Sequence, residues 1–410
     1  MPYSTRTTCR ICADRRLKTV LSLGELYIND FVEPGKPVEK APLELTRCLG
    51  CSLLQLRHTA PQELLYVRYY WYRSGVTDTM RVALRNITAR IESYFHLKAG
   101  DVVVDLGSND GTLIRSYQVP GLIRVGVEPA RNLAASGREG CDVFIDDFWS
   151  YERYQRHVGR PARVITAIGM FYDMEDPNTF IADAARALAA DGVFIAQLMC
   201  LRNMIDLCDV GNIGHEHLEY YSFAALEYLF ARHDLEVFDC ELNAVNGGSY
   251  RVFVRHRGAS VTGDAGATAR VAAIREAESN LQDEGIYDRF RARIESNREA
   301  CVNFIRRAVA AGKRVWIYGA STKGNTILQY YGLDHTLIEG ASDRSPEKWG
   351  KYTVGTMIPI FSEEEARARQ PDYFLVMPYA FIDEFYAREK AWRQAGGTFL
   401  LPLPEFKVLS

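Results

Sequence analysis

The 410-residue sequence predicts an α/β fold in three parts, a small cysteine-bearing unit followed by two Rossmann-like units. Three observations predict it. Two C-x-x-C pairs lie within the first 51 residues, short β-branched runs alternate with helical runs from 101 to about 255, and a similar alternation restarts at 314. We therefore expect domains at 1–70, 71–262 and 263–410.

The first unit carries four cysteines in two matched pairs, Cys9 with Cys12 and Cys48 with Cys51. Four thiolates in two i, i+3 turns fit a tetrahedral zinc ion. Since protein thiolates would fill all four positions, the metal would have no open site. We expect structural zinc that stabilises the fold and takes no part in catalysis.

A helical connector leads into the second unit. After an aromatic stretch at 66–72, apolar residues recur at helical spacing, and this pattern predicts an amphipathic helix. The residues in this apolar pattern are Val82, Leu84, Ile87, Ile91 and Phe95.

The second unit opens with an apolar strand, VVVDLG, which contains Asp105 and runs into the loop Gly107-Ser-Asn109-Asp-Gly111. Glycines in such a loop let backbone approach a ligand closely, and the loop should open at the carboxyl edge of a parallel sheet. Glu128 ends the next strand, where an acid can accept hydrogen bonds from both hydroxyls of a ribose. The pattern predicts a nucleoside-containing cofactor.

The loop does not read Gly-x-Gly-x-x-Gly, which a pyrophosphate-containing dinucleotide would favour. It resembles the first motif of class I methyltransferases, whose cofactor S-adenosylmethionine carries no phosphate. By that resemblance, Asp146, Asp147 and Phe148 after the third strand would border the adenine. The alternative is a plain strand–turn–helix with a surface glutamate.

The segment 209–221, DVGNIGHEHLEYY, places His215 and His217 on either side of Glu216. A histidine with an orienting neighbour is a candidate general base. The spacing differs from H-E-x-x-H, so it does not favour a catalytic zinc. The alternative is a loop whose histidines cap helices or satisfy core hydrogen bonds.

Residues 263–312 are rich in Ala, Arg and Glu and predict one or two long helices before the third unit. There, Gly319 follows a strand and opens a glycine turn that contains Lys323, a combination that suits a diphosphate. Asp343, at the end of the next strand, is placed to meet a ribose or base. The alternative is a Rossmann-like turn used only for packing.

Four segments resemble, in the same order, the signature segments of the sugar C-methyltransferase family, whose members build C3-branched sugars such as tetronitrose and mycarose. They are His215–His217, Asn246–Arg251, Tyr318–Thr326 and Gly355–Ile360. The resemblance covers nearly the whole chain, including the four-cysteine unit. One departure is Gly214, where family members often have tyrosine before His-Glu-His.

The resemblance implies a zinc-binding unit, a class I methyltransferase domain, and a Rossmann-like domain that helps to hold a sugar nucleotide. It identifies His217 as the base, and Tyr70 or Tyr72 as a side chain lining the same site. The further residues that we expect at the substrate are Ser74, Asn246, Arg251, Gly319, Lys323, Asn325 and Asp343.

We therefore expect a C-methyltransferase that uses S-adenosylmethionine to methylate the carbon next to the ketone, C3, of a nucleotide-linked 4-keto-6-deoxy sugar. His217 would generate an enolate, Glu216 or His215 would set its tautomer, and Tyr72 would hydrogen-bond the sugar or the enolate. The alternatives are an O- or N-methyltransferase of a sugar or small metabolite, and a non-catalytic sugar-nucleotide-binding protein.

Composition excludes other classes. The net charge is -3, with no block of five or more Lys and Arg, so we expect no nucleic-acid partner. No apolar stretch approaches the roughly 18–20 residues of a membrane span, and the amino terminus has no signal-peptide core. We expect a cytoplasmic monomer.

Overall fold

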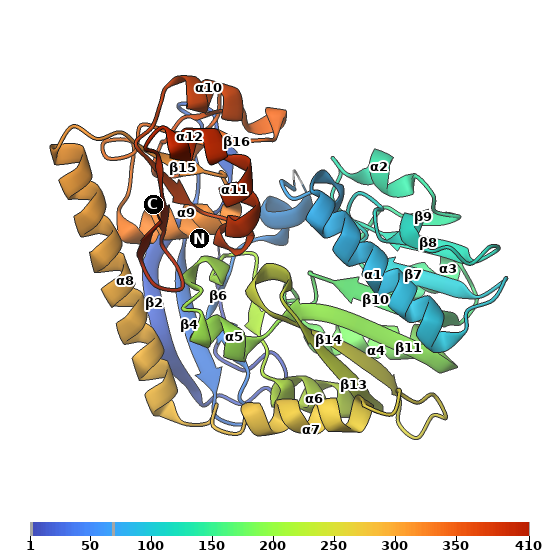
Figure 1. Cartoon of the computed structure of the whole chain (residues 1–410). Helices are drawn as coiled ribbons and strands as arrows, with labels where there is room; N and C mark the ends of the chain where they lie inside the picture. Colours follow the sequence, from blue (N-terminus) through green and yellow to red (C-terminus); the bar gives the residue numbers. More distant parts are fainter. Residues whose placement is uncertain (1–2, 68–69, 410) are drawn as a thin grey trace.

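Three larger sheets, drawn from different parts of the sequence, carry the fold (Figure 1). The computed structural model describes residues 3–67 and 70–409. The α/β class is confirmed, because two of these sheets consist mainly of parallel strands with helices between them. In the described part of the chain, no helix is both long enough and apolar enough to cross a membrane.

The middle sheet has seven strands in the order β13-β14-β11-β10-β7-β8-β9. The five strands β7 to β11 of this sheet are parallel, and the hairpin β13–β14 adds antiparallel strands at one edge. The strands are β7 (Val102–Leu106), β8 (Ile123–Val127), β9 (Val143–Ile145), β10 (Ala162–Ile168), β11 (Leu188–Met199), β13 (Leu235–Asn243) and β14 (Ser249–His256). The strand order places β8 and β9 on one side of β7 and β10 on the other.

Helices connect these strands. Helix α1 (Asp78–Phe95) begins at Thr77, whose side chain caps Met80 N, and buries four of the five predicted apolar positions. Val82 is the exception, at 45% exposed. The other helices of this part are α2 (Ala134–Arg138), α3 (Tyr151–His157), α4 (Pro177–Ala187), α5 (Leu201–Asp206) and α6 (Phe223–Ala231).

The carboxyl-terminal sheet has the order β18-β16-β15-β19-β20-β21, and only β21 is antiparallel. Two helices, α7 (Ala267–Ala277) and the long α8 (Glu284–Ala310), precede it, as the sequence predicts. Its strands are β15 (Val315–Tyr318), β16 (Gly340–Asp343), β18 (Ile360–Ser362), β19 (Tyr373–Val376), β20 (Thr398–Leu401) and β21 (Lys407–Leu409). Its helices are α9 (Thr322–Tyr331), α10 (Glu363–Ala368), α11 (Ile382–Arg388) and α12 (Lys390–Gln394).

The amino-terminal sheet contains a strand that sequence patterns did not assign to it. Its order is β12-β5-β4-β2, where β2 is Leu17–Tyr27, β4 is Lys40–Cys48 and β5 is Leu54–Leu56. Strand β12 (Glu219–Tyr220) comes from the middle of the chain and pairs antiparallel with β5. The His-Glu-His segment is thereby joined directly to the cysteine-bearing unit.

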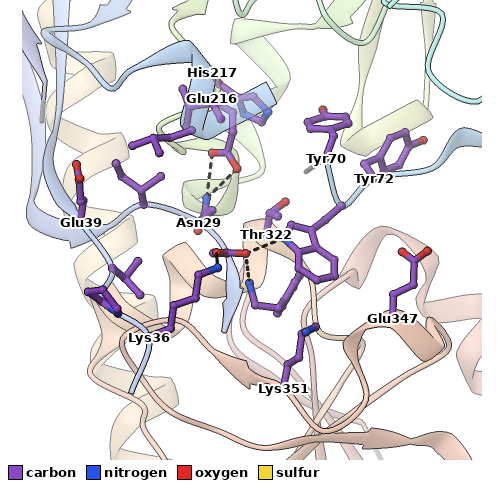
Figure 2. Close-up of a pocket in the computed structure, with 18 residues that line it drawn as sticks. Asn29, Lys36, Glu39, Tyr70, Tyr72, Glu216, His217, Thr322, Glu347 and Lys351 are labelled. Carbon is purple, nitrogen blue, oxygen red and sulfur yellow. Dashed lines mark hydrogen bonds and ion pairs between the residues drawn. The ribbon is translucent and has the colours of Figure 1, made fainter. Parts of the chain in front are cut away.

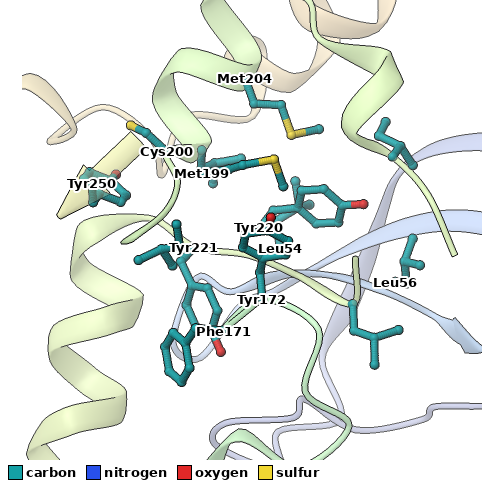
Figure 3. Packing of buried hydrophobic residues seen from close by; sticks show 14 of the residues in the cluster. Leu54, Leu56, Phe171, Tyr172, Met199, Cys200, Met204, Tyr220, Tyr221 and Tyr250 are labelled. Carbon is teal, nitrogen blue, oxygen red and sulfur yellow. The ribbon is translucent and has the colours of Figure 1, made fainter. Parts of the chain in front are cut away.

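Two short strand pairs complete the fold, and the second of them connects the amino-terminal part to the carboxyl-terminal part. Strand β1 (Ser4–Thr5) pairs with β6 (His58–Thr59), and β3 (Phe31–Val32) pairs with β17 (Tyr352–Thr353) of the carboxyl-terminal part. One hydrophobic cluster runs through all three parts, and Figure 3 shows Leu54 and Leu56 of β5 packed among Tyr172 and Tyr220. The boundaries at 70 and 262 stay predictions.

Candidate active site

A cavity of about 370 Å³ lies at the carboxyl ends of β7, β8 and β10, where the sequence predicts the cofactor. We call it the donor cavity. Its predicted lining residues are Gly107, Asn109, Glu128, Phe148, Tyr70, Tyr72 and Ser74. Sequence reasoning missed Trp149, Gly169, Met170, Asp173, Met174 and Phe180, although the end of the predicted strand RVITAIGM points to the same sheet edge.

Backbone hydrogen bonds hold the glycine loop around Glu128. The backbone N–H of Gly107, at φ +66°, donates to the Val127 carbonyl 2.9 Å away. The Glu128 carboxylate accepts hydrogen bonds from Asn109 N and Ala130 N, both at 2.8 Å. Burial raises the pKa of Glu128, while these two donors favour its ionised form. The carboxylate keeps further lone pairs for hydroxyl groups in the cavity.

Four predicted cofactor residues lie outside the lining. Asp105 is buried beneath the loop, where it accepts a hydrogen bond from Thr166 at 2.7 Å, and burial raises its pKa to about 7. Gly111, at φ +77°, supports the turn. Asp146 and Asp147 pair with Arg138 and Arg153 near the surface. Thus Asp105 and Gly111 shape the loop from outside the cavity.

The segment from Tyr70 to Ser74 forms a wall of the donor cavity and is fixed through its backbone. The side-chain amide of Asn132 accepts from Tyr70 N at 3.0 Å and donates to Tyr70 O at 3.1 Å. The Asn109 amide donates to Tyr72 O at 3.1 Å and accepts from Ser74 N at 3.0 Å. Tyr72 is therefore placed by the glycine loop itself, and Tyr70 by Asn132, which follows β8.

A second cavity, of about 510 Å³, shares Tyr70 and Tyr72 with the first. We call it the acceptor cavity. Figure 2 shows His217 and Glu216 on one side of it and Lys36 and Lys351 across from them. Its walls come from all three parts of the chain: the 28–39 segment, the Tyr70–Tyr72 and Glu216–His217 segments, and Thr322, Glu347 and Lys351.

His217 is oriented by a backbone carbonyl. Its Nδ1 lies 2.7 Å from Asn212 O, which also accepts from the Tyr220 hydroxyl at 3.2 Å. Because a carbonyl oxygen only accepts, Nδ1 carries the proton and Nε2 holds the free lone pair of the neutral ring. Burial lowers the pKa of His217 to about 4, so the ring is neutral at physiological pH.

The predicted orienting roles of His215 and Glu216 are wrong. His215 Nε2 lies 2.9 Å from Ala41 O in β4, and the side chain is only 2% exposed. The Glu216 carboxylate instead accepts from Asn29 Nδ2 at 3.0 and 3.2 Å. His215 therefore satisfies a core hydrogen bond, which is the alternative that the sequence left open, and Glu216 faces the acceptor cavity.

Gly214 leaves room for this Glu216–Asn29 pair. A Cβ atom at position 214 would lie 2.8 Å from Glu216 Oε2 and 3.4 Å from Asn29 Nδ2. Real Cβ atoms essentially never approach that closely, so a larger side chain at 214 would force the carboxylate to move. The departure from the family pattern thus lies directly beside a carboxylate that lines the cavity.

None of the four predicted substrate residues of the third unit, Gly319, Lys323, Asn325 and Asp343, is among the residues that line the acceptor cavity. Asn325 donates to Asp30 O at 3.0 Å, and Asp343 pairs with Lys348 at 3.1 Å. Lys323, next to the lining residue Thr322, is close enough to lower the pKa of His217. At Gly319, with φ +81°, a Cβ atom would lie 2.7 Å from Pro378, so this turn packs closely against Pro378 and leaves no room for a side chain.

Two further predicted residues belong to the hairpin β13–β14. The Arg251 guanidinium donates to Gln197 Oε1 at 3.0 Å and pairs with Glu241 at 3.2 Å, within the sheet and outside both cavities. The side chain of Asn246 lies outside the described residues.

The four predicted zinc ligands come together. All four sulfur atoms lie within 4.8 Å of one another, and the Cys9–Cys51 and Cys12–Cys48 pairs are 3.5 and 3.4 Å apart. Thiolates bound at about 2.3 Å to a tetrahedral ion lie about 3.8 Å apart, so the cluster fits zinc. Strand β5 begins just after this cluster and carries β12, in register Leu54 with Tyr220.

Comparisons with known proteins agree with this arrangement. Residues 9–66 match the family described as "Putative zinc binding domain", and residues 244–404 match "C-methyltransferase C-terminal domain". The chain is 31% identical to the C-methyltransferase NovU of Streptomyces niveus over 411 residues, which cover 98% of this chain and 96% of NovU.

Similarities to solved structures are weaker. The mitomycin 7-O-methyltransferase MmcR is 15% identical over 43% of this chain and 54% of its own, with a TM-score of 0.33. Magnesium protoporphyrin IX methyltransferase from Synechocystis PCC 6803 is 12% identical over 43% of this chain and 79% of its own, also with a TM-score of 0.33. The match to NovU extends over almost the entire length of both chains, and the chain belongs to the family of C-methyltransferases that contains NovU.

Proposed function

We propose that the protein uses S-adenosylmethionine to methylate the carbon next to the ketone, C3, of a nucleotide-linked 4-keto-6-deoxy sugar. The observation that carries this proposal is the meeting of the two cavities at Tyr70 and Tyr72. Glu128 lies on the donor side of these tyrosines and His217 on the acceptor side. A methyl group crossing from one cavity to the other would pass beside them.

The donor cavity suits S-adenosylmethionine in its chemistry. Glu128 would accept hydrogen bonds from the ribose hydroxyls, and the bare backbone of Gly107 permits close approach. Phe148 and Trp149 offer aromatic surface to the adenine. When bound, the cofactor supplies a methyl group already activated by its positive sulfur.

The difficult step is to make a carbon nucleophilic, and His217 supports it. Its Nε2 would take the proton from the carbon next to the ketone, and the electrons of that C–H bond would form an enolate with its charge on oxygen. A hydroxyl of Tyr70 or Tyr72 would donate a hydrogen bond to that oxygen. The carbon would then form its bond to the methyl group as the methyl–sulfur bond breaks, and His217 would release its proton to solvent.

The acceptor cavity also suits a charged substrate larger than a free sugar. Lys36 and Lys351 line it, paired at 3.2 Å with Asp30 and at 3.5 Å with Glu33. These are weak, partly exposed pairs, so either ammonium group could turn to a diphosphate. Its volume of about 510 Å³ falls in the range of sites for small organic ligands.

The test is to incubate the enzyme with S-adenosylmethionine and a panel of nucleotide-linked 4-keto-6-deoxy sugars. We expect mass spectrometry to detect one added methyl group and carbon NMR to place it on C3, not on C5 across the ketone. In heavy water without the methyl donor, the hydrogen next to the ketone should exchange for deuterium. Methylation on oxygen or nitrogen, without such exchange, would contradict the proposal.

A further inference from the structure

Asp173 is a buried carboxyl group that the predicted site did not include. It follows β10 at the same sheet edge as the glycine loop and lines the donor cavity, although it is only 5% exposed. Its Oδ1 atom has no hydrogen-bond partner among the described residues. Both oxygens of Glu128, by contrast, accept backbone hydrogen bonds. A buried carboxylate oxygen without a partner is costly, and it points to a ligand that supplies a hydrogen-bond donor or a positive charge.

The strand order gives Asp173 a definite place in the cavity. Glu128 and Phe148 follow β8 and β9, on one side of β7, whereas Asp173 follows β10 on the other side. The neighbour of Asp173, Tyr172, holds its ring edge-on to His217 with ring centroids 4.9 Å apart. A nucleoside whose ribose is on Glu128 would therefore direct its reactive end toward Asp173 and the base.

Among the described residues, no positively charged side chain forms an ion pair with Asp173. Burial raises the pKa of Asp173 well above its ordinary range, and the nearby carboxylates of Glu219 and Glu216 raise it further. Glu219 is compensated by Arg10 at 3.7 Å, but no ion pair reaches Asp173 from the described part of the chain. A cation placed in the cavity would restore the ionised form of Asp173 and pair with it.

We infer that the Asp173 carboxylate binds the positively charged sulfur of the methyl donor and so distinguishes S-adenosylmethionine from the product S-adenosylhomocysteine. This inference rests on the proposed function. The two ligands differ at the sulfur, which is cationic in the donor and neutral in the product. Before transfer the pair holds the methyl-bearing end near Tyr70, and afterwards the attraction disappears and the product leaves more easily.

The test compares affinities for the two ligands by isothermal titration of the full chain. In Asp173→Asn, we expect affinity for S-adenosylmethionine to fall at least about tenfold, because a close charge pair in a protein interior is lost. Affinity for S-adenosylhomocysteine should stay within about threefold, and this also shows that the cavity is still folded. Asp183→Asn is the matched control, since Asp183 lines the same cavity but already accepts from Tyr151 N at 3.1 Å. It should leave the ratio of the two affinities unchanged.

A third ligand keeps the test from depending on a single cationic compound. Sinefungin carries a protonated amine where the methyl donor has its sulfonium, so Asp173→Asn should weaken it as well. Equal weakening of all three ligands would overturn the inference, because Asp173 would then contact a shared part such as the ammonium group or hold the fold. An unchanged ratio would overturn it too. If the wild-type protein bound neither S-adenosylmethionine nor its product, the proposed function itself would fail.

Discussion

The Nδ1 atom of His217 lies 2.7 Å from the carbonyl oxygen of Asn212, so the ring presents Nε2 as its proton acceptor. Asn212 ends a short turn, Val210–Asn212, that packs against α9 of the carboxyl-terminal part. His217 itself is followed by β12, which belongs to the amino-terminal sheet. The orientation of the base therefore depends on contacts with both flanking parts of the chain.

Replacing His217 tests its role as the base. We expect His217→Asn to lower kcat by roughly 10²- to 10⁴-fold, since a positioned general base contributes about that much. Titration should show nearly wild-type affinity for S-adenosylmethionine, because His217 lines only the acceptor cavity. Exchange of the hydrogen next to the ketone should be lost in parallel. His157→Asn, on the surface of α3, is the control, and near-wild-type kcat in His217→Asn would refute the assignment.

The two buried histidines should make stability depend on pH. Burial lowers the pKa of His215 and of His217 to about 4, against about 6.5 in an unfolded chain. Between these values the unfolded state binds more protons, so the free energy of unfolding falls as pH drops from 6.5 toward 4. Each histidine contributes on the order of 3 kcal/mol to that loss.

Urea unfolding at pH 7 and pH 5 measures this dependence. His215→Asn removes one titrating group and should be less stable at pH 7, because the contact with Ala41 O is altered. Its further loss between pH 7 and pH 5 should be smaller than that of the wild type. An equal loss in both proteins would show that His215 titrates normally in the folded state.

Glu128 lines the donor cavity and Asp146 does not, so replacing each of them tests which acid contacts the cofactor. We expect Glu128→Gln to weaken binding of S-adenosylhomocysteine by roughly 10- to 100-fold, because hydrogen bonds from the ribose to a charged acceptor are lost. Asp146→Asn should bind almost like the wild type, since Asp146 is exposed and paired with Arg138 outside the cavity. Titration calorimetry measures both. A larger effect at Asp146 would mean that the adenine lies nearer to β9.

Zinc should stabilise the fold without entering the reaction. We expect Cys12→Ser, or chelation of the metal, to lower Tm by at least about 5 °C, because the site joins the Cys9–Cys12 turn to the Cys48–Cys51 turn between β4 and β5. Any loss of kcat should follow the loss of folded protein. Metal analysis should find about one zinc per chain in the wild type and in the control Cys141→Ser, whose thiol lies far along the sequence from the cluster. A zinc requirement at constant folding would contradict the structural role.

Much of the fold could be read from local pattern. The apolar spacing of Leu84, Ile87 and Ile91 predicted helix α1, because a helix repeats its buried face every 3.6 residues. Val82 departs from that pattern, because its side chain is 45% exposed. Strand β12 could not be predicted, because two residues carry no periodicity and their pairing with Leu54 is an interaction between distant segments.

The sequence by itself determined the features that short segments specify: two cysteine pairs at zinc spacing, a glycine loop followed by Glu128, and a histidine suited to act as a base. Tertiary structure decided what those groups contact. His215 hydrogen-bonds to the Ala41 carbonyl, Glu216 accepts a hydrogen bond from Asn29, and the Asn212 carbonyl orients His217. The physical reason is that a loop side chain turns toward whichever partner the packing brings near, and Ala41 and Asn29 lie more than 170 residues away in the chain.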